Sequence, residues 1–227
     1  MKTNRYSFSL MLLLFVSSFC IDKSYAQFSI APYVTFNKLG GANMIGVGGR
    51  GEIEGLGKKV DGKFPLFGGV AFGFGSAKST NYVSAYSSLT SPSQMEVQVT
   101  YKFSLIHIFI GGKRYFGQGE YSEGGFYGLG DVGLMIVPIK TKYDSYNVAL
   151  YYPTGGSATT NGESKETLAD IMFDFGLGFE KGSDDLKFFG EAKIAIPASG
   201  VNSREGTDSP LGVGVALNVG VRLSLGR

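Results

Sequence analysis

The sequence of 227 residues contains no tryptophan and only one cysteine and one histidine. The cysteine, Cys20, lies in an N-terminal segment with the pattern of an export signal. The exported chain would therefore have no thiol, no disulfide and no cysteine metal site. A metal site built on His107, the single histidine, would need partners that the sequence does not offer. We therefore expect no metal ligands and no cofactor.

Long apolar runs are also missing after the N-terminal segment. The longest run, Leu134 to Ile139, contains Pro138 and is far shorter than the roughly 20 apolar residues that a membrane helix needs. Lipid cannot hydrogen-bond to open backbone groups. If the exported chain enters a membrane, we therefore expect it to do so as a closed β-barrel.

The start of the chain has the pattern of a secretory signal peptide. Lys2 and Arg5 provide the positive end, and an apolar run follows from Leu10. Ser24-Tyr25-Ala26 places small residues at the −3 and −1 positions of a cleavage site. The sequence therefore predicts a removed signal peptide over 1–26.

A lipoprotein signal ending at Cys20 is the competing interpretation, but Phe19 is too bulky to precede a lipidated cysteine. Cleavage after Ala26 would leave one domain over 27–227. This domain would keep 18 basic and 18 acidic residues of the original 21 and 19, a net charge of zero. That balance argues against nucleic acid as a partner.

The clearest pattern in the chain is a strict alternation over 211–226. Every odd position from Leu211 to Leu225 is Leu or Val, and the even positions are Gly, Ala, Asn, Arg or Ser. Successive side chains of a strand point to opposite faces, so this run is a strand with one wholly apolar face. At roughly 3.3 Å per residue it is about 50 Å long, enough to cross a bilayer at a tilt.

Seven further segments alternate in the same way. The eight expected strands lie at about 27–37, 43–54, 64–75, 94–115, 124–142, 166–180, 185–197 and 211–226. Long connections at 76–93, 143–165 and 198–210 would lie at one end, and the tight turn 181–184 at the other. The sequence predicts an all-β protein, an eight-stranded antiparallel up-and-down transmembrane β-barrel after a cleaved signal peptide. A soluble β-sandwich or lipocalin-like barrel is the main alternative.

The strand expected at 94–115 has a less regular pattern. Its apolar residues are odd-numbered from Met95 to Phe103 and even-numbered from Ile106 to Ile110. With apolar side chains facing lipid, this change of phase predicts a bulge near Leu105.

Several segments resemble a known family. They are Tyr101-Lys102-Phe103, the run from Gly111 to Phe116, the glycine-rich run from Gly125 to Gly130, and the terminal strand. Together with the order of strands, they resemble the small outer-membrane β-barrel proteins of Gram-negative bacteria. The closest resemblance is to the outer membrane protein beta-barrel domain proteins common in Bacteroidota-type bacteria.

The resemblance covers the whole exported chain and implies a location in the cell outer membrane. Outer-membrane lipid and lipopolysaccharide would be partners, and so would the barrel-assembly machinery during biogenesis. Such chains commonly end in an aromatic residue, whereas this chain ends Leu225-Gly226-Arg227. We expect this departure to affect assembly more than fold.

Charged residues on the polar strand faces are expected to face the lumen. They are Arg50, Glu52, Glu96, Lys102, Asp131, Asp170, Asp174, Lys187, Glu191, Lys193 and Arg222. Buried charges must be paired or hydrated, and eight strands enclose an interior that side chains nearly fill. A plugged, salt-bridged lumen is therefore the leading interpretation, and a narrow polar conduit is the alternative.

The outer loops are the other candidate surface. Tyrosine stands there among Ser, Thr, Gly and Asn, a composition suited to contacts. The contact candidates are Tyr82, Tyr86, Tyr146, Tyr151 and Tyr152. Solvated loops and aromatic residues at the headgroup level explain the same residues without a partner, so an extracellular ligand or surface partner remains unidentified.

No motif indicates catalysis or cofactor binding. The G-x-G-x-x-G runs at 46–51 and 128–133 lie in expected strands, not at a helix start as nucleotide binding requires. Ile108 and Phe109 follow His107, with no serine at the short spacing that a lipid A deacylase would show, and His107 is interpreted as structural. The sequence thus predicts a non-enzymatic outer-membrane barrel with a structural or surface-interaction role. A porin-like channel for small or hydrophobic solutes is the first alternative, and an outer-membrane lipid-modifying enzyme is the second.

Overall fold

The computed structural model describes residues 27–39, 42–54, 65–116, 124–144, 146–153, 163–198 and 213–225. The predicted signal peptide over 1–26 and the chain end at 226–227 lie outside these ranges. Within them, no helix is long and apolar enough to cross a membrane.

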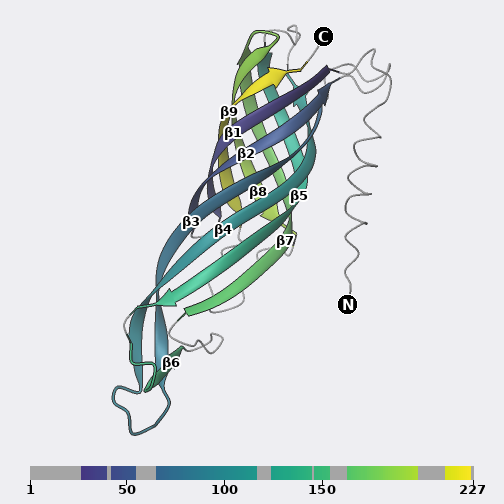
Figure 1. Ribbon diagram of the computed structural model, residues 1–227. Coiled ribbons are helices and arrows are strands. Elements are labelled where there is room, and N and C mark those ends of the chain that lie inside the picture. Colours follow the sequence, from purple (N-terminus) through teal and green to yellow (C-terminus); the bar gives the residue numbers. More distant parts are fainter. Residues whose placement is uncertain are drawn as a thin grey trace, which may run out of the picture.

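The described residues form nine strands in one antiparallel sheet, and eight of them close into a ring (Figure 1). The ring order is β2-β1-β9-β8-β7-β5-β4-β3, and pairing of β3 with β2 closes it. The ninth strand, β6, pairs with the end of β3. The strands are β1 (Gln27–Leu39), β2 (Ala42–Glu54), β3 (Leu66–Ala85), β4 (Gln94–Tyr115), β5 (Gly124–Tyr143), β6 (Tyr151–Pro153), β7 (Glu163–Gly182), β8 (Leu186–Pro197) and β9 (Gly214–Ser224). The predicted eight-stranded up-and-down barrel is confirmed.

The pairing register is staggered around the ring. A path of directly paired residues that leaves β1 at Ser29 crosses every other strand of the ring and returns to β1 at Leu39, a stagger of 10 from position 29 to position 39. Such a stagger accompanies the strand tilt that closes a sheet into a barrel. With eight strands, the interior is just wide enough for side chains to fill.

The strand β4 keeps one register along its whole length. Its pairs with β3 run without interruption from Leu66↔Gly112 to Ser84↔Gln94, and its odd-numbered side chains face inward throughout. The predicted bulge near Leu105 is therefore wrong. On one side of Leu105, β4 belongs to the closed ring, and on the other side it belongs to an open sheet. Its apolar residues lie on the outer face in the first part and on the inner face in the second.

Four strands continue beyond the ring. Pairing of β2 with β3 stops at Asn43↔Ser76, and pairing of β8 with β7 stops at Met172↔Pro197. Beyond these points β3, β4, β5 and β7 remain paired with one another and form a curved open sheet that carries β6 on its edge (Figure 1). We call this sheet the extension, residues 77–85, 94–103, 139–143, 151–153 and 163–168. The sequence placed 76–93 in a loop, but its first ten residues continue β3.

The extension has its own small core on its inward face. Val83, Val97 and Val99 pack there with Tyr143 and Tyr151, and all five are buried. Its outward face is polar, with exposed side chains at Lys78, Thr80, Gln94, Glu96, Gln98, Lys102, Lys140 and Lys142. The extension thus has the pattern of a water-soluble sheet.

Candidate functional site

The outer wall of the ring is apolar on all sides. Exposed outward side chains include Phe28, Val34 and Phe36 of β1, Ile45 and Val47 of β2, Phe72 and Phe74 of β3, Ile108 and Ile110 of β4, Val132 and Leu134 of β5, Ile171, Phe173, Phe175 and Leu177 of β7, Phe188 and Ile194 of β8, and Val215, Leu217 and Val219 of β9. A continuous apolar surface of this extent marks a surface that meets lipid or another apolar partner. The closed ring leaves no strand edge within it, as spanning a bilayer requires.

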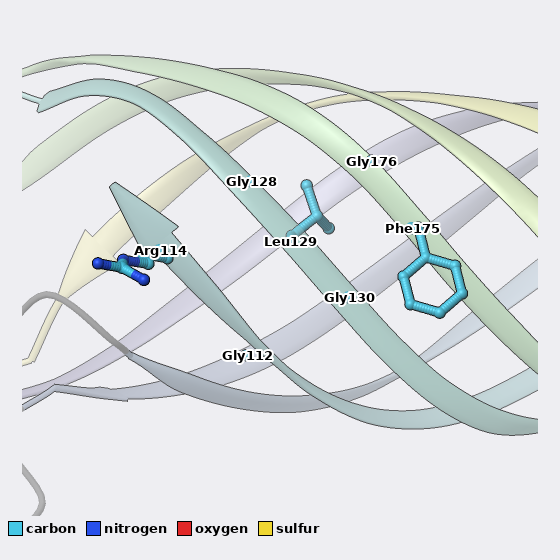
Figure 2. Close-up of a pocket in the computed structure, with 7 residues that line it drawn as sticks. All are labelled: Gly112, Arg114, Gly128, Leu129, Gly130, Phe175 and Gly176. Atoms are coloured by element: carbon cyan, nitrogen blue, oxygen red, sulfur yellow. The ribbon is translucent and has the colours of Figure 1, made fainter. Parts of the chain in front are cut away.

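A shallow depression lies on the wall between β4, β5 and β7 (Figure 2). Glycine backbone at Gly112, Gly128 and Gly130 forms much of its floor, and Phe175 and Arg114 border it. The run 128–133 thus lies within β5 and opens no helix, as expected for a strand.

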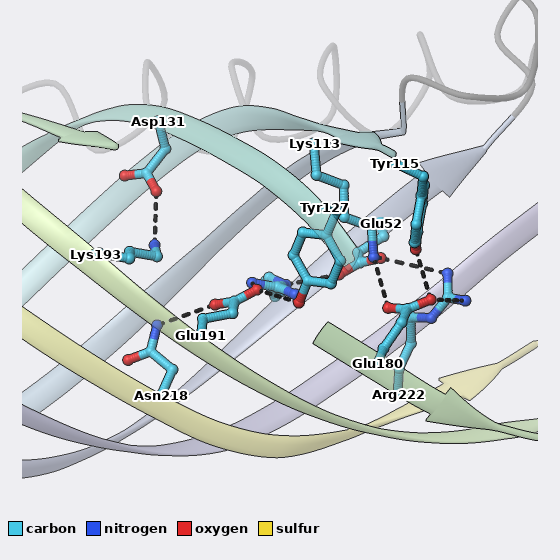
Figure 3. A network of polar contacts seen from close by, with 11 residues as sticks. Glu52, Lys113, Tyr115, Tyr127, Asp131, Glu180, Glu191, Lys193, Asn218 and Arg222 are labelled. Atoms are coloured by element: carbon cyan, nitrogen blue, oxygen red, sulfur yellow. Dashed lines mark hydrogen bonds and ion pairs between the residues drawn. The ribbon is translucent and has the colours of Figure 1, made fainter. Parts of the chain in front are cut away.

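A network of charged side chains fills the lumen towards the end of the ring where β1 begins (Figure 3). Arg50 is its centre: Nε lies 2.7 Å from Glu52 Oε1, and Nη1 lies 2.6 Å from Glu191 Oε1. Tyr127 and Asn218 also donate to Glu191, at 2.8 and 3.1 Å. The guanidinium packs against aromatic rings as well, 4.7 Å from the ring centroid of Phe189.

A second group of charges joins this one through Glu52. Lys113 Nζ lies 2.7 Å from Glu52 Oε2 and 3.1 Å from Glu180 Oε2. Arg222 also bridges these two carboxylates, at 3.5 Å from Glu52 and 2.9 Å from Glu180. The hydroxyl of Tyr115 donates to Glu180 at 2.6 Å.

The buried charges balance within the described residues. Five are basic and five acidic: Arg50, Lys113, Lys187, Lys193 and Arg222 face Glu52, Asp131, Asp174, Glu180 and Glu191. Paired charges with good geometry can offset the loss of hydration, whereas an unpaired one is strongly destabilising. The network therefore fills and rigidifies the lumen.

An apolar layer closes the other half of the lumen. It consists of Leu39, Ala42, Met44, Phe103, Leu105, Met135, Val137, Ile139, Met172 and Ala195, all buried. The layer lies between the charged network and the core of the extension, and Phe103 and Ile139 belong to the first residues of the extension. Along the described part of the lumen, ion pairs are thus followed by packed apolar side chains.

The structure places most of the predicted lumen residues inside. Arg50, Glu52, Asp131, Asp174, Lys187, Glu191, Lys193 and Arg222 are buried. Asp170 occupies an inward position of β7 at the mouth of the ring, half-buried, where Oδ1 accepts a hydrogen bond from the Ile171 amide at 2.8 Å.

Glu96 and Lys102 are the exceptions. Both are exposed on the outward face of the extension, so their assignment to the lumen is wrong. The apolar face of β4 was predicted to be the outer one along its whole length. Beyond the ring that face is the inner one, and it forms the core of the extension.

Several interior residues were not predicted from the sequence. Lys113 and Glu180 hold the second half of the network, and Tyr115 and Tyr127 donate to it. A single phase along β4 would have placed Lys113 inside, since it is odd-numbered like the buried Phe109. The polar face of β7, which also carries Asp174, holds Glu180.

The tyrosine candidates of the outer loops separate into two groups. Tyr82, Tyr86 and Tyr152 are exposed, and the rings of Tyr86 and Tyr152 lie 5.0 Å apart. Tyr146 is half-buried, and Tyr151 is buried in the core of the extension. Tyr151 is therefore not available for surface contacts, because its position on β6 faces inward.

Two ionisable pairs lie on the extension. The hydroxyl of Tyr82 donates to Glu96 Oε1 at 2.8 Å, and this hydrogen bond raises the pKa of Tyr82. Lys140 Nζ lies 2.8 Å from Glu163 Oε2, and its hydrogen bond lowers the pKa of Glu163. Both pairs are solvated, so each is worth little to stability.

Comparison with known proteins identifies the fold. No family model matches the chain, and no curated protein matches it. The solved structures include a major outer membrane protein from Thermus thermophilus, which is 11% identical with a TM-score of 0.52 over 88% of this chain and 99% of that chain. At this identity the similarity shows the fold, the barrel of a small outer-membrane protein.

Two further solved structures are similar to this chain with TM-scores below 0.5. One is to Ail, the attachment invasion locus protein of Yersinia pestis, 10% identical with a TM-score of 0.45 over 88% of this chain and 97% of that chain. The other is to Neisserial surface protein A, 11% identical with a TM-score of 0.38 over the same shares of the two chains.

Proposed function

We propose that this chain is an integral outer-membrane β-barrel protein without enzymatic activity. Its closed barrel anchors the extension, which makes contacts outside the cell. One observation carries the proposal: the outward face changes from apolar to polar at the same level on four neighbouring strands.

The change from apolar to polar outward side chains occurs within two residues on each of these strands. On β3 the outward residues are apolar up to Phe74 and polar from Ser76, and on β4 they change between Ile106 and Ser104. The apolar part of β3, from Leu66 to Phe74, has about nine residues, the length of a tilted transmembrane strand. Lipid around the ring accounts for the apolar part of the outward faces, and water around the extension accounts for the polar part.

Orientation follows from the two ends of the barrel. The start of β1, the end of β9 and the tight turn between β7 and β8 lie at one end, and the extension lies at the other (Figure 1). Outer-membrane barrels place short turns in the periplasm and long connections outside. The extension therefore faces the exterior, and export would use the signal peptide over 1–26.

The filled lumen favours an anchor over a channel. Salt-bridged side chains and the apolar layer leave no continuous polar path among the described residues. In planar bilayers, the purified protein should show little or no conductance. Steady large openings would favour the porin-like alternative instead.

A row of lysines suits outer-leaflet lipid. In the sheet register Lys102 lies directly opposite Lys140, and Lys140 lies directly opposite Lys165. Three outward lysines therefore stand side by side just beyond the apolar wall. Like charges directly opposite one another are destabilising. Only Lys140 of the three has an ion pair among the described residues, with Glu163. Phosphate groups of lipopolysaccharide at this level would neutralise the row.

Lipopolysaccharide binding can be tested directly. The double variant Lys102→Gln, Lys165→Gln should lose most of the rise in unfolding temperature that added lipopolysaccharide gives the wild-type chain. Lys181→Gln is the matched control, since Lys181 is exposed on β7 at the periplasmic end. An equal response of all three proteins would contradict this partner.

The proposal as a whole depends on a membrane location. Heat-modifiable migration and fractionation with the outer membrane are expected, together with a mature N-terminus at Gln27. Purification without detergent would overturn it. Lipid A of cells with and without the protein should have the same mass spectrum, because His107 lies inside the barrel beneath the apolar layer. A changed acylation pattern would support the enzyme alternative.

A further inference from the structure

Three side chains with metal-binding atoms meet inside the barrel. They are His107 of β4, Asp131 of β5 and Asp174 of β7, from three adjacent strands, and one ligand atom of each lies within 4.8 Å of the others. Asp131 and Asp174 are direct partners in the sheet register. The sequence offered no partner for His107, because these carboxylates are 24 and 67 positions away in the chain.

Gly133 makes room for the imidazole. This glycine is an inward position of β5, two residues after Asp131, and a Cβ there would overlap His107 Nε2. The ring therefore lies over bare backbone and is directed towards the carboxylates. The second glycine-rich run of the sequence, 128–133, thus supplies both a carboxylate and the space beside it.

Each of the three side chains has a polar atom without a donor or acceptor. His107 Nε2, Asp131 Oδ1 and Asp174 Oδ1 are buried and have no hydrogen-bond partner. Asp131 and Asp174 are both 6% exposed. Buried polar atoms are nearly always satisfied in native proteins. These three atoms belong to side chains that each place a ligand atom within 4.8 Å of the others, so one bound ion would satisfy them together.

The charge of the cluster also calls for a cation. Lys193 Nζ lies 2.7 Å from Asp131 Oδ2 (Figure 3). The same nitrogen lies 3.9 Å from Asp174 Oδ2. One ammonium group faces two carboxylates, and close like charges cannot both remain ionised without further compensation. Lys193 contacts the Oδ2 atom of each carboxylate. The carboxyl groups of Asp131 and Asp174 also hydrogen-bond to each other, and a bound ion would replace this contact.

We propose that this cluster binds one divalent transition-metal ion of the zinc type, through His107 Nε2 and one oxygen each of Asp131 and Asp174. Neutral imidazole with two carboxylates is a set of ligands that Zn²⁺ accepts, and the nitrogen ligand disfavours Mg²⁺ and Ca²⁺. The ion would crosslink β4, β5 and β7 inside the ring. The inference does not depend on the membrane role of the protein.

The experiment uses the full mature chain without a histidine tag, refolded in detergent after removal of metals. Zn²⁺ is supplied in one sample during refolding and in another afterwards, and bound metal is counted by mass spectrometry after dialysis. One Zn²⁺ per folded chain in either sample supports the site. No stoichiometric metal in both samples means that the carboxylates share a proton instead, and overturns it.

Two conservative variants locate the ion. Asp174→Asn and His107→Gln keep the approximate shape of each side chain and should each weaken Zn²⁺ binding at least tenfold, the loss of about 10–100-fold that even outer-shell partners cause. Asp170→Asn is the matched control, because Asp170 is an inward carboxylate on the same strand but outside the cluster. Unchanged affinity in both ligand variants would also overturn the proposal.

A spectroscopic readout separates ligation from a structural effect. Co²⁺ in place of Zn²⁺ should give visible d–d absorption in the wild-type chain and in Asp170→Asn, but not in His107→Gln. Heat-modifiable migration shows in each case that the barrel has formed. A folded His107→Gln variant with the wild-type Co²⁺ spectrum would exclude the imidazole as a ligand.

Discussion

The ring and the extension are built from the same strands but have opposite chemistry. Along β4, the ring places Ile108 outside and Lys113 inside, whereas the extension places Gln98 outside and Val99 inside. Register and side-chain phase are the same in both regions. The apolar face of β4 is therefore the outer face in the ring and the inner face in the extension. An apolar strand face shows that the face meets an apolar environment, but it does not show whether that face is inner or outer.

The comparison is sharpest for buried charge. Glu52→Gln should lower the free energy of unfolding by about 3–5 kcal/mol, because it leaves Lys113 and Arg222 with a weakened partner in the interior. Glu96→Gln on the extension should change it by less than about 0.5 kcal/mol. Urea unfolding of the two variants in lipid vesicles measures both. Similar losses would mean that the network contributes no more than a solvated carboxylate.

The outer face provides the second contrast. Ile108→Arg should destabilise the folded protein by about 2–4 kcal/mol, as an arginine facing the middle of a bilayer does. Gln98→Arg lies on the same face of the same strand beyond the lipid and should be nearly neutral. Folding yield and unfolding in vesicles would show the difference. A tolerated Ile108→Arg would place the bilayer elsewhere on the wall.

The core of the extension should unfold separately from the ring. Val99→Thr buries a hydroxyl without a partner and should destabilise the extension by about 1–3 kcal/mol. The ring should keep its heat-modifiable migration, since Val99 belongs to the buried cluster of the extension with Val83, Val97, Tyr143 and Tyr151. Hydrogen exchange and limited proteolysis would detect faster opening of 77–103. Loss of the whole barrel would contradict this independence.

The smallest effect concerns the exposed ion pair of the extension. Lys140→Met should raise the pKa of Glu163 towards its ordinary value, because the hydrogen bond from Lys140 is the largest cause of the lowered pKa and only the weaker influence of Lys142 and Lys165 remains. A lowered pKa stabilises the folded form above the ordinary carboxyl pKa, and this contribution disappears as the pH falls through the lowered value. Carboxyl titration by NMR measures the shift, and about 1 M salt should reduce it in the wild-type chain. An unchanged pKa in Lys140→Met would assign the shift to another group.

Much of the fold could be predicted from alternation alone. The eight ring strands, their order and the tight turn between β7 and β8 follow from period-two patterning and chain order. The continuation of β3 to Ala85 could not, because residues 76–85 are rich in Ser and Thr and pair with β4 only in the folded sheet. The short strand β6 depends in the same way on the edge that β2 leaves open.

The interior was predicted less completely. Alternation placed Arg50, Glu191 and Arg222 correctly, because their strands have a single environment from end to end. It misplaced Lys102, because the outward face of β4 is polar beyond the ring. It missed Lys113, although the outward Ile106 and Ile108 already place odd-numbered residues inside that part of β4. Which carboxylate faces which cation depends on the stagger of the ring, and no local pattern encodes it.

By itself, the sequence determined which residues alternate, that eight strands close the ring, and that charges of both signs lie on the polar strand faces. These properties follow from side-chain direction in a strand, which is local. The tertiary structure decided which face is inner, where the lipid-facing wall ends, and that His107 lies beside Asp131 and Asp174. Those outcomes depend on closure of the ring, which sets residues far apart in the chain side by side and separates lipid, water and interior.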